Sequence, residues 1–299
     1  MVDRNKNLFY IIGNNKKILF KSTDFWWNTA LWHKITNDKQ LTYKVLEQNN
    51  IPTANSFYLS RNDLSDFHQH TIDHLTFPLI IKPLDESHWN GVCMNIMSYQ
   101  ELQGKLKISF EKYESMIIQE QIEWEEIRVI VVDDEVLVAI VRIPAFVIWN
   151  GRNTIEELID IENTSNKFRG EWYNKPLAYI VIDQELKDYI QKQWLHLWTI
   201  PKENTRIQLR WNSNIWTGWI PKNITDQLHP QTKELCIEIW KILWLRFSWI
   251  DIILKNTSEP LNKKNWILLE VNSTAGIWWH SELAWVNTWK RILEKLFFK

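Results

Sequence analysis

The sequence predicts an α+β fold, in which strands and helices mix without the strict alternation of a parallel sheet with crossover helices. Two observations support this class. Short apolar runs of strand length recur along the chain, and several are followed by turn residues. Helix-start patterns stand between these runs, such as Ser98-Tyr-Gln-Glu101 and Thr154-Ile-Glu-Glu157, which place a capping hydroxyl three residues before a glutamate.

The N-terminal half is expected to begin with short strands and turns over residues 1–35. A helix then starts at Asp38 and ends before Pro52, which cannot continue it, and a second helix starts at Ser98. The strands expected in this half are residues 77–83, 92–96, 116–122, 127–132 and 136–143. The last two form a hairpin around Asp133.

In the C-terminal half, the Thr154 pattern starts a helix, and residues 163–178 are expected to form a polar loop. The remaining elements expected are strands at residues 207–210, 248–253 and 267–272, and helices at residues 231–243 and 281–296.

Composition excludes several classes of function. The chain has 299 residues, a net charge of −1 and no basic excess, so it lacks the electrostatic signature of a nucleic-acid-binding protein. Its two cysteines, Cys93 and Cys236, are too few for a disulfide framework and fit a reducing cytosol. No signal-peptide core follows Met1, and no apolar run approaches the ~20 residues of a membrane span. We therefore expect a soluble cytoplasmic protein.

One feature of the composition is abnormal: there are 20 Trp but only 7 Gly, whereas glycine alone makes up about 7% of an average chain. Trp stands where glycine is expected, as at Trp89 in a polar loop and at Trp219 after Gly218. Turns and phosphate loops need positive φ or close backbone approach, which an indole does not supply cheaply. A Trp-rich stacking surface is the alternative, but it would not place Trp systematically in turns. We hypothesise that most of these positions are glycine in the cell, encoded by UGA.

The strand at residues 267–272 carries two candidate metal ligands. Side chains alternate along a strand, so Glu270 and Asn272 share one face and stand roughly 7 Å apart. Carboxylate and amide oxygens suit hard cations such as Mg²⁺. If the strand at residues 248–253 pairs with this one, Asp251 joins the cluster. The alternative is an acid and an amide that face water at a strand end.

Lys82 ends an apolar strand and precedes a loop of small and polar residues, Asp85 to Gly91. An amine at a strand end suits phosphate groups, and the N–H groups of such a loop supply further donors. The alternative is a lysine at a sheet edge that extends its charge into water. The order of features along the chain favours phosphate: a lysine, a loop, an apolar strand with acids, an arginine-rich loop, an aspartate and then Glu-x-Asn.

With this order of features the chain resembles the ATP-grasp ligases, in particular the ATP-grasp domains of cyanophycin synthetase and of the bifunctional glutathione-synthesising enzyme. The resemblance runs from about Thr36 to His280. It rests on Phe77-Pro-Leu-Ile-Ile-Lys-Pro-Leu-Asp85, Arg142-Ile-Pro-Ala145, Asn150-Gly-Arg-Asn-Thr-Ile155, Leu209-Arg-Trp-Asn-Ser-Asn-Ile215, Thr217-Gly-Trp219, Ile224-Thr-Asp226, His229-Pro230 and Leu269-Glu-Val-Asn-Ser-Thr-Ala-Gly276. The family carries glycine at the positions of Trp89 and Trp219, which supports the glycine hypothesis.

The resemblance implies an ATP-grasp fold, with two α+β lobes that hold the nucleotide between them. Residues 1–36 would be a short N-terminal segment before an ATP-grasp domain at 37–299. Within that domain, residues 37–118 would form a small mobile lobe and residues 119–299 a large lobe with the metal site.

The resemblance also implies a role for each candidate residue. Those expected at ATP are Lys39, Lys82, Ser87, Gly91, Gln119, Glu120, Gln121, Ile122 and Glu126. Those expected to bind two Mg²⁺ ions, with Mn²⁺ as an alternative, are Asp251, Glu270 and Asn272. The lysines and the loop residues would contact the phosphates, the four consecutive residues would line the adenine, and Glu126 would hold the ribose. Arg210, assisted by Arg142, would stabilise charge on the transferred phosphate; the alternatives are that Glu126 is merely solvated and that Arg142 covers the sheet.

The implied activity is that of an ADP-forming ligase, which passes the γ-phosphoryl group of ATP to a carboxylate and lets an amine attack the acylphosphate. Positioning and charge neutralisation dominate such chemistry, so no protein nucleophile is required. Amino acids or short peptides are the expected substrates; no nucleic acid or membrane is expected as a partner, and a homo-oligomer is compatible with the family. The alternatives are a D-alanine–D-alanine-type ligase and, if the Trp residues are genuine, an inactive nucleotide- or peptide-binding module.

Overall fold

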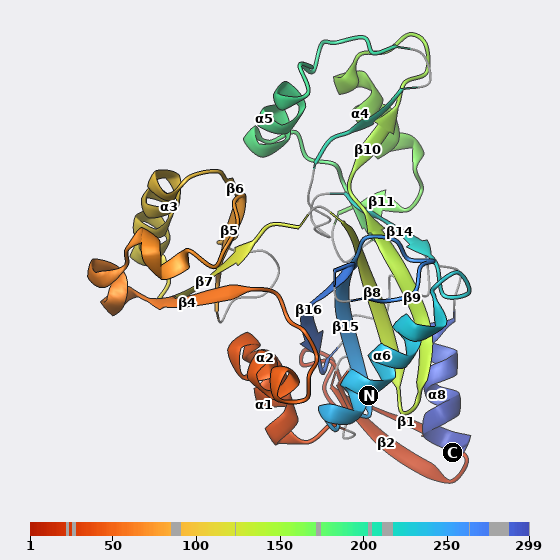
Figure 1. Cartoon of the computed structure of the whole chain (residues 1–299). Helices are drawn as coiled ribbons and strands as arrows, with labels where there is room; N and C mark the ends of the chain where they lie inside the picture. The colour runs from red at the N-terminus through yellow and green to blue at the C-terminus, as the bar shows by residue number, and fades with distance from the viewer. Residues whose placement is uncertain are drawn as a thin grey trace. The chain divides into compact units, whose positions relative to one another are not determined.

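The computed structural model describes residues 1–21, 24–25, 28–84, 91–122, 124–171, 175–202, 205–210, 218–262, 264–274 and 287–298 (Figure 1). The chain divides into two compact units, residues 1–137 with 227–275 and residues 138–226 with 276–299. Both units combine helices with strands, which confirms the predicted α+β class. The division into lobes at residue 118 stays a prediction. No helix in the described ranges is long and apolar enough to cross a membrane.

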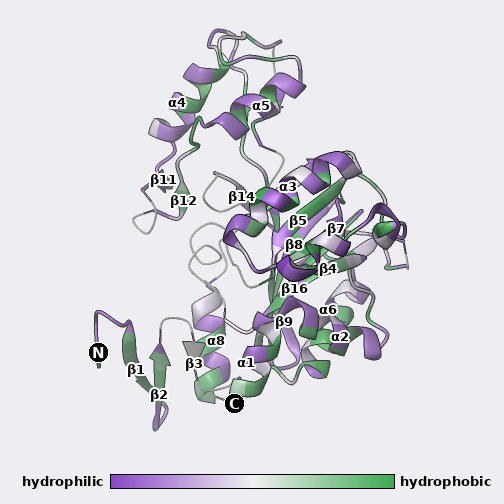
Figure 2. Cartoon of the chain, turned by 90° about the vertical axis from the view of Figure 1, so that its left-hand side faces the viewer, coloured by the Kyte–Doolittle hydropathy of each residue, from purple (hydrophilic) through white to green (hydrophobic). Residues whose placement is uncertain are grey.

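The first unit contains a four-stranded antiparallel sheet with a helix on one face (Figure 1). In spatial order its strands are β4 (Ser56–Ser60), β7 (Ser115–Glu120), β5 (Leu79–Pro83) and β6 (Cys93–Ile96). Helix α3 (Tyr99–Lys112) buries Leu102 and Leu106 against Leu79 and Ile81 of β5, and Figure 2 shows hydrophobic colour along β5 beneath this helix. The predicted strands and the helix after Ser98 are therefore confirmed to within a few residues.

A second group of strands in the first unit has β15 (Phe247–Leu254) between β8 (Glu125–Val132) and β16 (Trp266–Asn272), all antiparallel. Every residue of β15 is buried, including Ser248 and Asp251, which stand among apolar residues. Helix α6 (Pro230–Ile242) packs on β15 and β8. The predicted pairing of the strands at 248–253 and 267–272 is confirmed, and so is the hairpin that joins β8 to the start of β9 (Glu135–Ile143).

The N-terminal residues form strands, as predicted, and then a helix that the sequence analysis does not predict. Strand β2 (Lys16–Lys21) pairs with β1 (Leu8–Gly13) and β3 (Asp24–Phe25). Helix α1 (Ala30–Asn37) follows, because the Thr29 hydroxyl accepts the Trp32 N–H and caps it. Residues 30–35 are therefore helical rather than strand or turn. Three further elements complete this part of the chain: α2 (Lys39–Gln48), which Asp38 caps as predicted, and the 3₁₀ turns η1 (Arg61–Asp66) and η2 (Gln69–Ile72).

The second unit has its apolar core between two helices and two short strands. The helices are α4 (Ile155–Ser165) and α5 (Gln184–Lys192), and the strands are β10 (Phe146–Ile148) and β13 (Arg206–Gln208). Thr154 and Glu157 form the predicted capping box at the start of α4. The other elements of this unit are most of β9, its partner β14 (Ile220–Asn223), the parallel pair β11 (Arg169–Gly170) and β12 (Leu177–Ala178), and α8 (Thr288–Phe298).

Two expectations for the second unit need correction. Residues 163–178 are not simply a polar loop, because α4 continues to Ser165 and the β11–β12 pair follows. Arg169 organises this segment: its buried guanidinium donates to the Glu162 carboxylate and to the carbonyl groups of Ala178 and Gly218. The described part of the C-terminal helix begins at Thr288 rather than at Ser281, and residues 281–286 lie outside the described ranges.

Two tryptophans occupy a helix-terminal position that favours glycine. Trp194 follows α5 with φ 60°, and Trp244 follows α6 with φ 46°. Both helices end in a Schellman cap, whose hydrogen bonds are Trp194 to Gln191, Leu195 to Ile190, Trp244 to Lys241 and Leu245 to Trp240. Helix α2 ends in the same way at Asn50, a residue type that tolerates positive φ. The side chains of Trp194 and Trp244 are 94% and 75% exposed, so packing does not compensate for the backbone strain.

We expect Trp194→Gly and Trp244→Gly each to raise the free energy of unfolding by about 1 kcal/mol, because glycine removes the strain of positive φ. Denaturant unfolding measures this change. Trp198→Gly is the matched control, since Trp198 is also exposed but is absent from the residues with positive φ; it should not stabilise the chain. Equal effects at all three positions would contradict the strain argument.

The glycine hypothesis further predicts UGA codons at Trp194 and Trp244 in the coding DNA, as at Trp89 and Trp219. The native protein should then have a mass that fits glycine at these positions. UGG codons together with a mass that fits tryptophan would rule the hypothesis out.

Candidate nucleotide and metal site

Strand pairing brings the three predicted metal ligands together. Asp251 on β15 lies directly opposite Glu270 on β16, and opposite residues of an antiparallel pair point to the same side of the sheet. The register shifts next to this pair, so that Leu269 is the extra residue of a bulge. Asn272 lies two residues beyond Glu270, and its amide donates to Glu270 Oε1 at 3.0 Å. The three side chains therefore share one face, as expected if the two strands pair.

Asp251 is held by an arginine that the sequence analysis misses. Arg128 on β8 lies opposite Asp251 and donates from Nε to Oδ1 at 2.7 Å and from Nη2 to Oδ2 at 2.6 Å. The Asp251 side chain is only 2% exposed, so this bidentate pair is almost withdrawn from water. The guanidinium also lies 3.7 Å from the centroid of the Trp249 ring. Each carboxylate oxygen can still accept a further partner, because an ionised carboxylate has about four acceptor sites.

Glu270 lies in a field of positive charge. Burial by itself would raise the pKa of Glu270. Lys39, the Asn272 amide and Lys82 lower it by more than burial raises it, so the net pKa lies below its ordinary value. The carboxylate is therefore ionised at neutral pH. Both predicted phosphate-binding lysines therefore lie close enough to act on the Glu270 carboxylate, Lys39 from the start of α2 and Lys82 from β5.

Lys82 projects from the face of the four-stranded sheet that α3 does not cover. Its neighbours Leu79 and Ile81 belong to the core under α3, and side chains alternate along the strand, so Lys82 faces the other side. Burial and repulsion by Lys39 lower the pKa of Lys82 to about 8, although Glu270 and Glu126 attract the charged form. A bound anion would restore the charge, because it stabilises the ammonium form.

Of the four predicted hinge residues, Gln119 and Glu120 end β7, and Gln121 and Ile122 follow it on the way to β8. Glu120 accepts the N–H of Thr76, and Gln121 exchanges two hydrogen bonds with Asn95. Gln119 is 1% exposed. These contacts fix the segment, so a base beside it would meet backbone groups, which is the kind of contact that the resemblance implies.

The remaining nucleotide candidates divide between described and undescribed residues. Ser87 and Trp89 lie outside the described ranges. Gly91 has φ +72°, and a Cβ at this position would lie 2.4 Å from the Tyr113 ring. Only glycine fits there without a backbone or ring movement. Glu126 is half-buried on β8, on the same face as Arg128, and lies close enough to Lys82 to attract its charge.

The two arginines predicted at the transferred phosphate belong to the second unit. Arg210 is 1% exposed, and it donates to Asp183 at 2.6 Å, to Glu185 at 3.2 Å and to the Val181 carbonyl at 2.9 Å. Its charge is therefore matched by two carboxylates in this structure. Arg142 lies on β9 and is 7% exposed. A role of either arginine at a substrate stays a prediction.

Tyr43 is a second residue that the sequence analysis misses. Its hydroxyl donates to the carbonyl of Leu269, the residue before Glu270, and so ties α2 to β16. Burial raises the pKa of Tyr43, which keeps the hydroxyl a donor. Arg128 could have been found from its alternation with Glu126 along a strand, but no sequence signal marks Tyr43.

The residues that converge here suit a nucleotide together with a divalent cation. Asp251, Glu270 and Asn272 supply oxygen donors, which hard cations prefer, while Lys39 and Lys82 supply positive charge for phosphates. Among the described residues no group of three His, Cys, Asp or Glu side chains could hold a metal alone. The Asn272 amide and oxygens of a bound nucleotide would therefore have to complete the coordination.

Comparison with known proteins gives one consistent result. Residues 36–147 match the family model of the RimK-like ATP-grasp domain. Cyanophycin synthetase from Trichormus variabilis is 30% identical over 268 residues, which are 89% of this chain but 29% of that protein. The glutathione biosynthesis bifunctional protein of Clostridium perfringens is 29% identical over 290 residues, which are 94% of this chain and 36% of that protein. The chain thus spans about a third of the length of these relatives.

Solved structures give the same fold. A bifunctional glutathione synthetase from Pasteurella multocida superposes with a TM-score of 0.73 at 21% identity, over 99% of this chain and 41% of that one. A D-alanine–D-alanine ligase from Bacillus anthracis superposes with a TM-score of 0.52 at 16% identity, over 87% of this chain and 67% of that one. The predicted ATP-grasp fold is therefore confirmed.

We expect Arg128→Gln to lower the free energy of unfolding by about 3 kcal/mol, because it leaves the Asp251 carboxylate buried without its partner. Arg246→Gln is the matched control. It also removes a bidentate pair, with Asp133, but those side chains are 47% and 19% exposed, so the cost should stay below about 1 kcal/mol. Urea unfolding measures both, and equal costs would show that burial of the Arg128 pair has no consequence.

We expect the affinity for ATP, without added metal, to fall about eightfold between pH 7.5 and pH 9, because a Lys82 with a pKa of about 8 loses its charge over this range. Isothermal titration at the two pH values measures the change. In Lys82→Arg, whose guanidinium stays charged, the affinity should be nearly constant. A pH dependence that is the same in both proteins would mean that another group is responsible.

Proposed function

The chain carries a RimK-like ATP-grasp domain and has the ATP-grasp fold, and from this premise we propose that it is an ADP-forming ligase that joins a carboxylate to an amine. The observation that carries the proposal is the convergence of two carboxylates, an amide and two lysines within one unit. Such a set suits phosphoryl transfer, which depends on positioning and charge neutralisation. We propose amino acids or short peptides as substrates, the class to which glutathione, named in one relative, belongs.

In this proposal the residues divide the work. Lys39 and Lys82 bind the phosphates, with Ser87 and Gly91 in the loop beside them, and residues 119–122 with Glu126 bind the nucleoside. Asp251, Glu270 and Asn272 hold Mg²⁺. Arg128 orients Asp251 from the neighbouring strand β8. When bound, Mg²⁺ offsets the repulsion between the polyphosphate and the substrate carboxylate. The pair Arg210 and Arg142 stabilises charge on the transferred group.

The bonds change in two stages. A carboxylate oxygen of the substrate attacks the γ-phosphorus, and ADP leaves. The amine nitrogen then attacks the acyl carbon, phosphate leaves with the bonding electrons, and the nitrogen loses a proton to give the amide. Water would destroy the acylphosphate, so closure of a lobe at residues 37–118 would protect it.

A second candidate, an inactive nucleotide-binding module, is favoured by Trp249. If this residue is tryptophan in the cell, its buried indole occupies the face beside Arg128 and Asp251. The two candidates differ in turnover, so they can be separated with the chain as written and with the same chain carrying glycine at its Trp positions.

We expect the glycine-bearing chain to release phosphate from ATP in the presence of Mg²⁺ and a mixture of amino acids and short peptides. Lys82→Ala should weaken nucleotide binding, because it removes the phosphate-facing charge. Glu270→Gln should keep nucleotide binding but lose metal-dependent turnover by about a hundredfold, since it removes a metal-ligand charge. Isothermal titration and a phosphate-release assay measure the two effects.

Lys107→Gln and Glu111→Gln, at exposed positions on α3, are the matched controls and should change neither property. Turnover like that of the unchanged protein in both Lys82→Ala and Glu270→Gln would refute the ligase assignment. Nucleotide binding without turnover in the glycine-bearing chain would leave the inactive module as the better account.

A further inference from the structure

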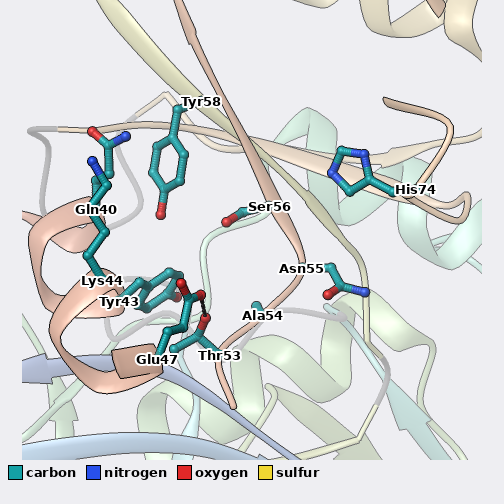
Figure 3. A pocket seen from close by; sticks show the side chains of 10 residues that line it. All are labelled: Gln40, Tyr43, Lys44, Glu47, Thr53, Ala54, Asn55, Ser56, Tyr58 and His74. Carbon is teal, nitrogen blue, oxygen red and sulfur yellow. Dashed lines mark hydrogen bonds between the residues drawn. The ribbon is translucent and has the colours of Figure 1, made fainter. Parts of the chain in front are cut away.

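A cavity of about 280 Å³ lies in the first unit, and none of the nucleotide or metal candidates lines it. Its walls come from α2, from β4 with the segment that leads into it, and from the residue His74 after η2 (Figure 3). The volume is many times the ~30 Å³ that one water molecule takes up in the liquid. It approaches the lower end of small-molecule sites, about 300 Å³.

The helical wall of this cavity presents one cation and one anion. Lys44 and Glu47 stand one turn apart on α2 and therefore on the same side of the helix. The Lys44 ammonium makes no hydrogen bond or ion pair with any residue that the structure describes. The Glu47 carboxylate accepts the Thr53 hydroxyl, which holds it at the cavity wall. The two charges are thus available to a ligand that carries the opposite pair.

The opposite wall offers hydroxyl groups. The Tyr58 hydroxyl is buried and has no hydrogen-bond partner among the described residues, and Figure 3 shows it and the Ser56 hydroxyl directed into the space before α2. Burial raises the pKa of Tyr58, so the phenol stays protonated and can donate. A buried donor without an acceptor is costly, and an oxygen atom of a ligand would satisfy it.

We propose that this cavity binds a free α-amino acid, whose carboxylate meets Lys44 and the Tyr58 hydroxyl and whose ammonium group meets Glu47. The pairing of charges selects this class. An inorganic anion or a phosphate ester would be repelled by Glu47, and a simple amine would leave Lys44 and Tyr58 unmatched. The site goes beyond the proposed ligase reaction, because it uses none of the residues assigned to ATP or Mg²⁺.

Isothermal titration of the full chain, without ATP or metal, tests the proposal with each protein amino acid in turn. We expect saturable binding of at least one of them. Lys44→Gln, Glu47→Gln and Tyr58→Phe should each weaken this binding by about tenfold. The first two each remove a charged hydrogen-bond partner of the ligand, and the third removes a buried one. Lys107→Gln and Glu111→Gln on α3 should leave it unchanged. The methyl ester and the N-acetyl derivative of the same amino acid, which lack one charge each, should bind as weakly as the variants.

The design separates this site from the ligase site. Lys82→Ala should bind the amino acid like the unchanged protein, whether or not the ligase proposal holds. Binding that Lys82→Ala abolishes and Lys44→Gln preserves would assign the amino acid to the ligation site and overturn the proposal. Absence of binding at about 10 mM, a weak limit for a specific small ligand, would overturn it too. Binding of inorganic phosphate in this cavity, together with no binding of any amino acid, would also overturn the proposal.

Discussion

The antiparallel pairing of β15 with its two neighbours is the constraint on which the candidate site depends. It places Asp251 opposite Arg128 on one side and opposite Glu270 on the other. A register slip of one residue would turn Asp251 to the other face of the sheet. Burial alone does not select the register, because both faces of β15 are buried. The bidentate pair of Arg128 with Asp251 supplies the specific contact that fixes the register at this point.

Charge balance follows from this geometry. Two carboxylates brought together repel each other, and here Arg128 neutralises one while Lys39 and Lys82 act on the other. Glu270 has a lowered pKa in the folded chain, so its contribution to stability is present at neutral pH and is lost as the pH falls through the folded-state value. The environment of Lys82 has the opposite effect on its charged form. Its pKa is lowered to about 8, so the folded chain destabilises the ammonium form. The repulsion between Lys39 and Lys82 favours phosphate ligands, because their negative charge stabilises both ammonium groups.

Local patterns in the sequence predict most elements, and part of what they miss depends on long-range contacts. The caps at Asp38 and Thr154 and the alternation of Glu270 with Asn272 are local, and all three are present. Alternation places Arg128 on the same face as Glu126, but no local pattern reveals its contact with a residue 123 positions away. Helix α1 is missed because its cap, Thr29, lacks the glutamate that completes a capping box, and the order around Arg169 depends on Gly218 far along the chain. Ser87, which lies outside the described ranges, stays a prediction, as do the roles of Arg142 and Arg210.

The pKa of Glu270, measured by NMR in the unchanged chain and in Lys39→Met, tests the central claim most directly. If α2, β5 and β16 bring the two lysines to the carboxylate cluster, this pKa lies below the ordinary glutamate value and rises when Lys39 loses its charge. A Glu270 pKa above the ordinary value, unchanged in Lys39→Met, would mean that burial acts without the lysines. That result would contradict the claim that the two lysines converge on the carboxylates.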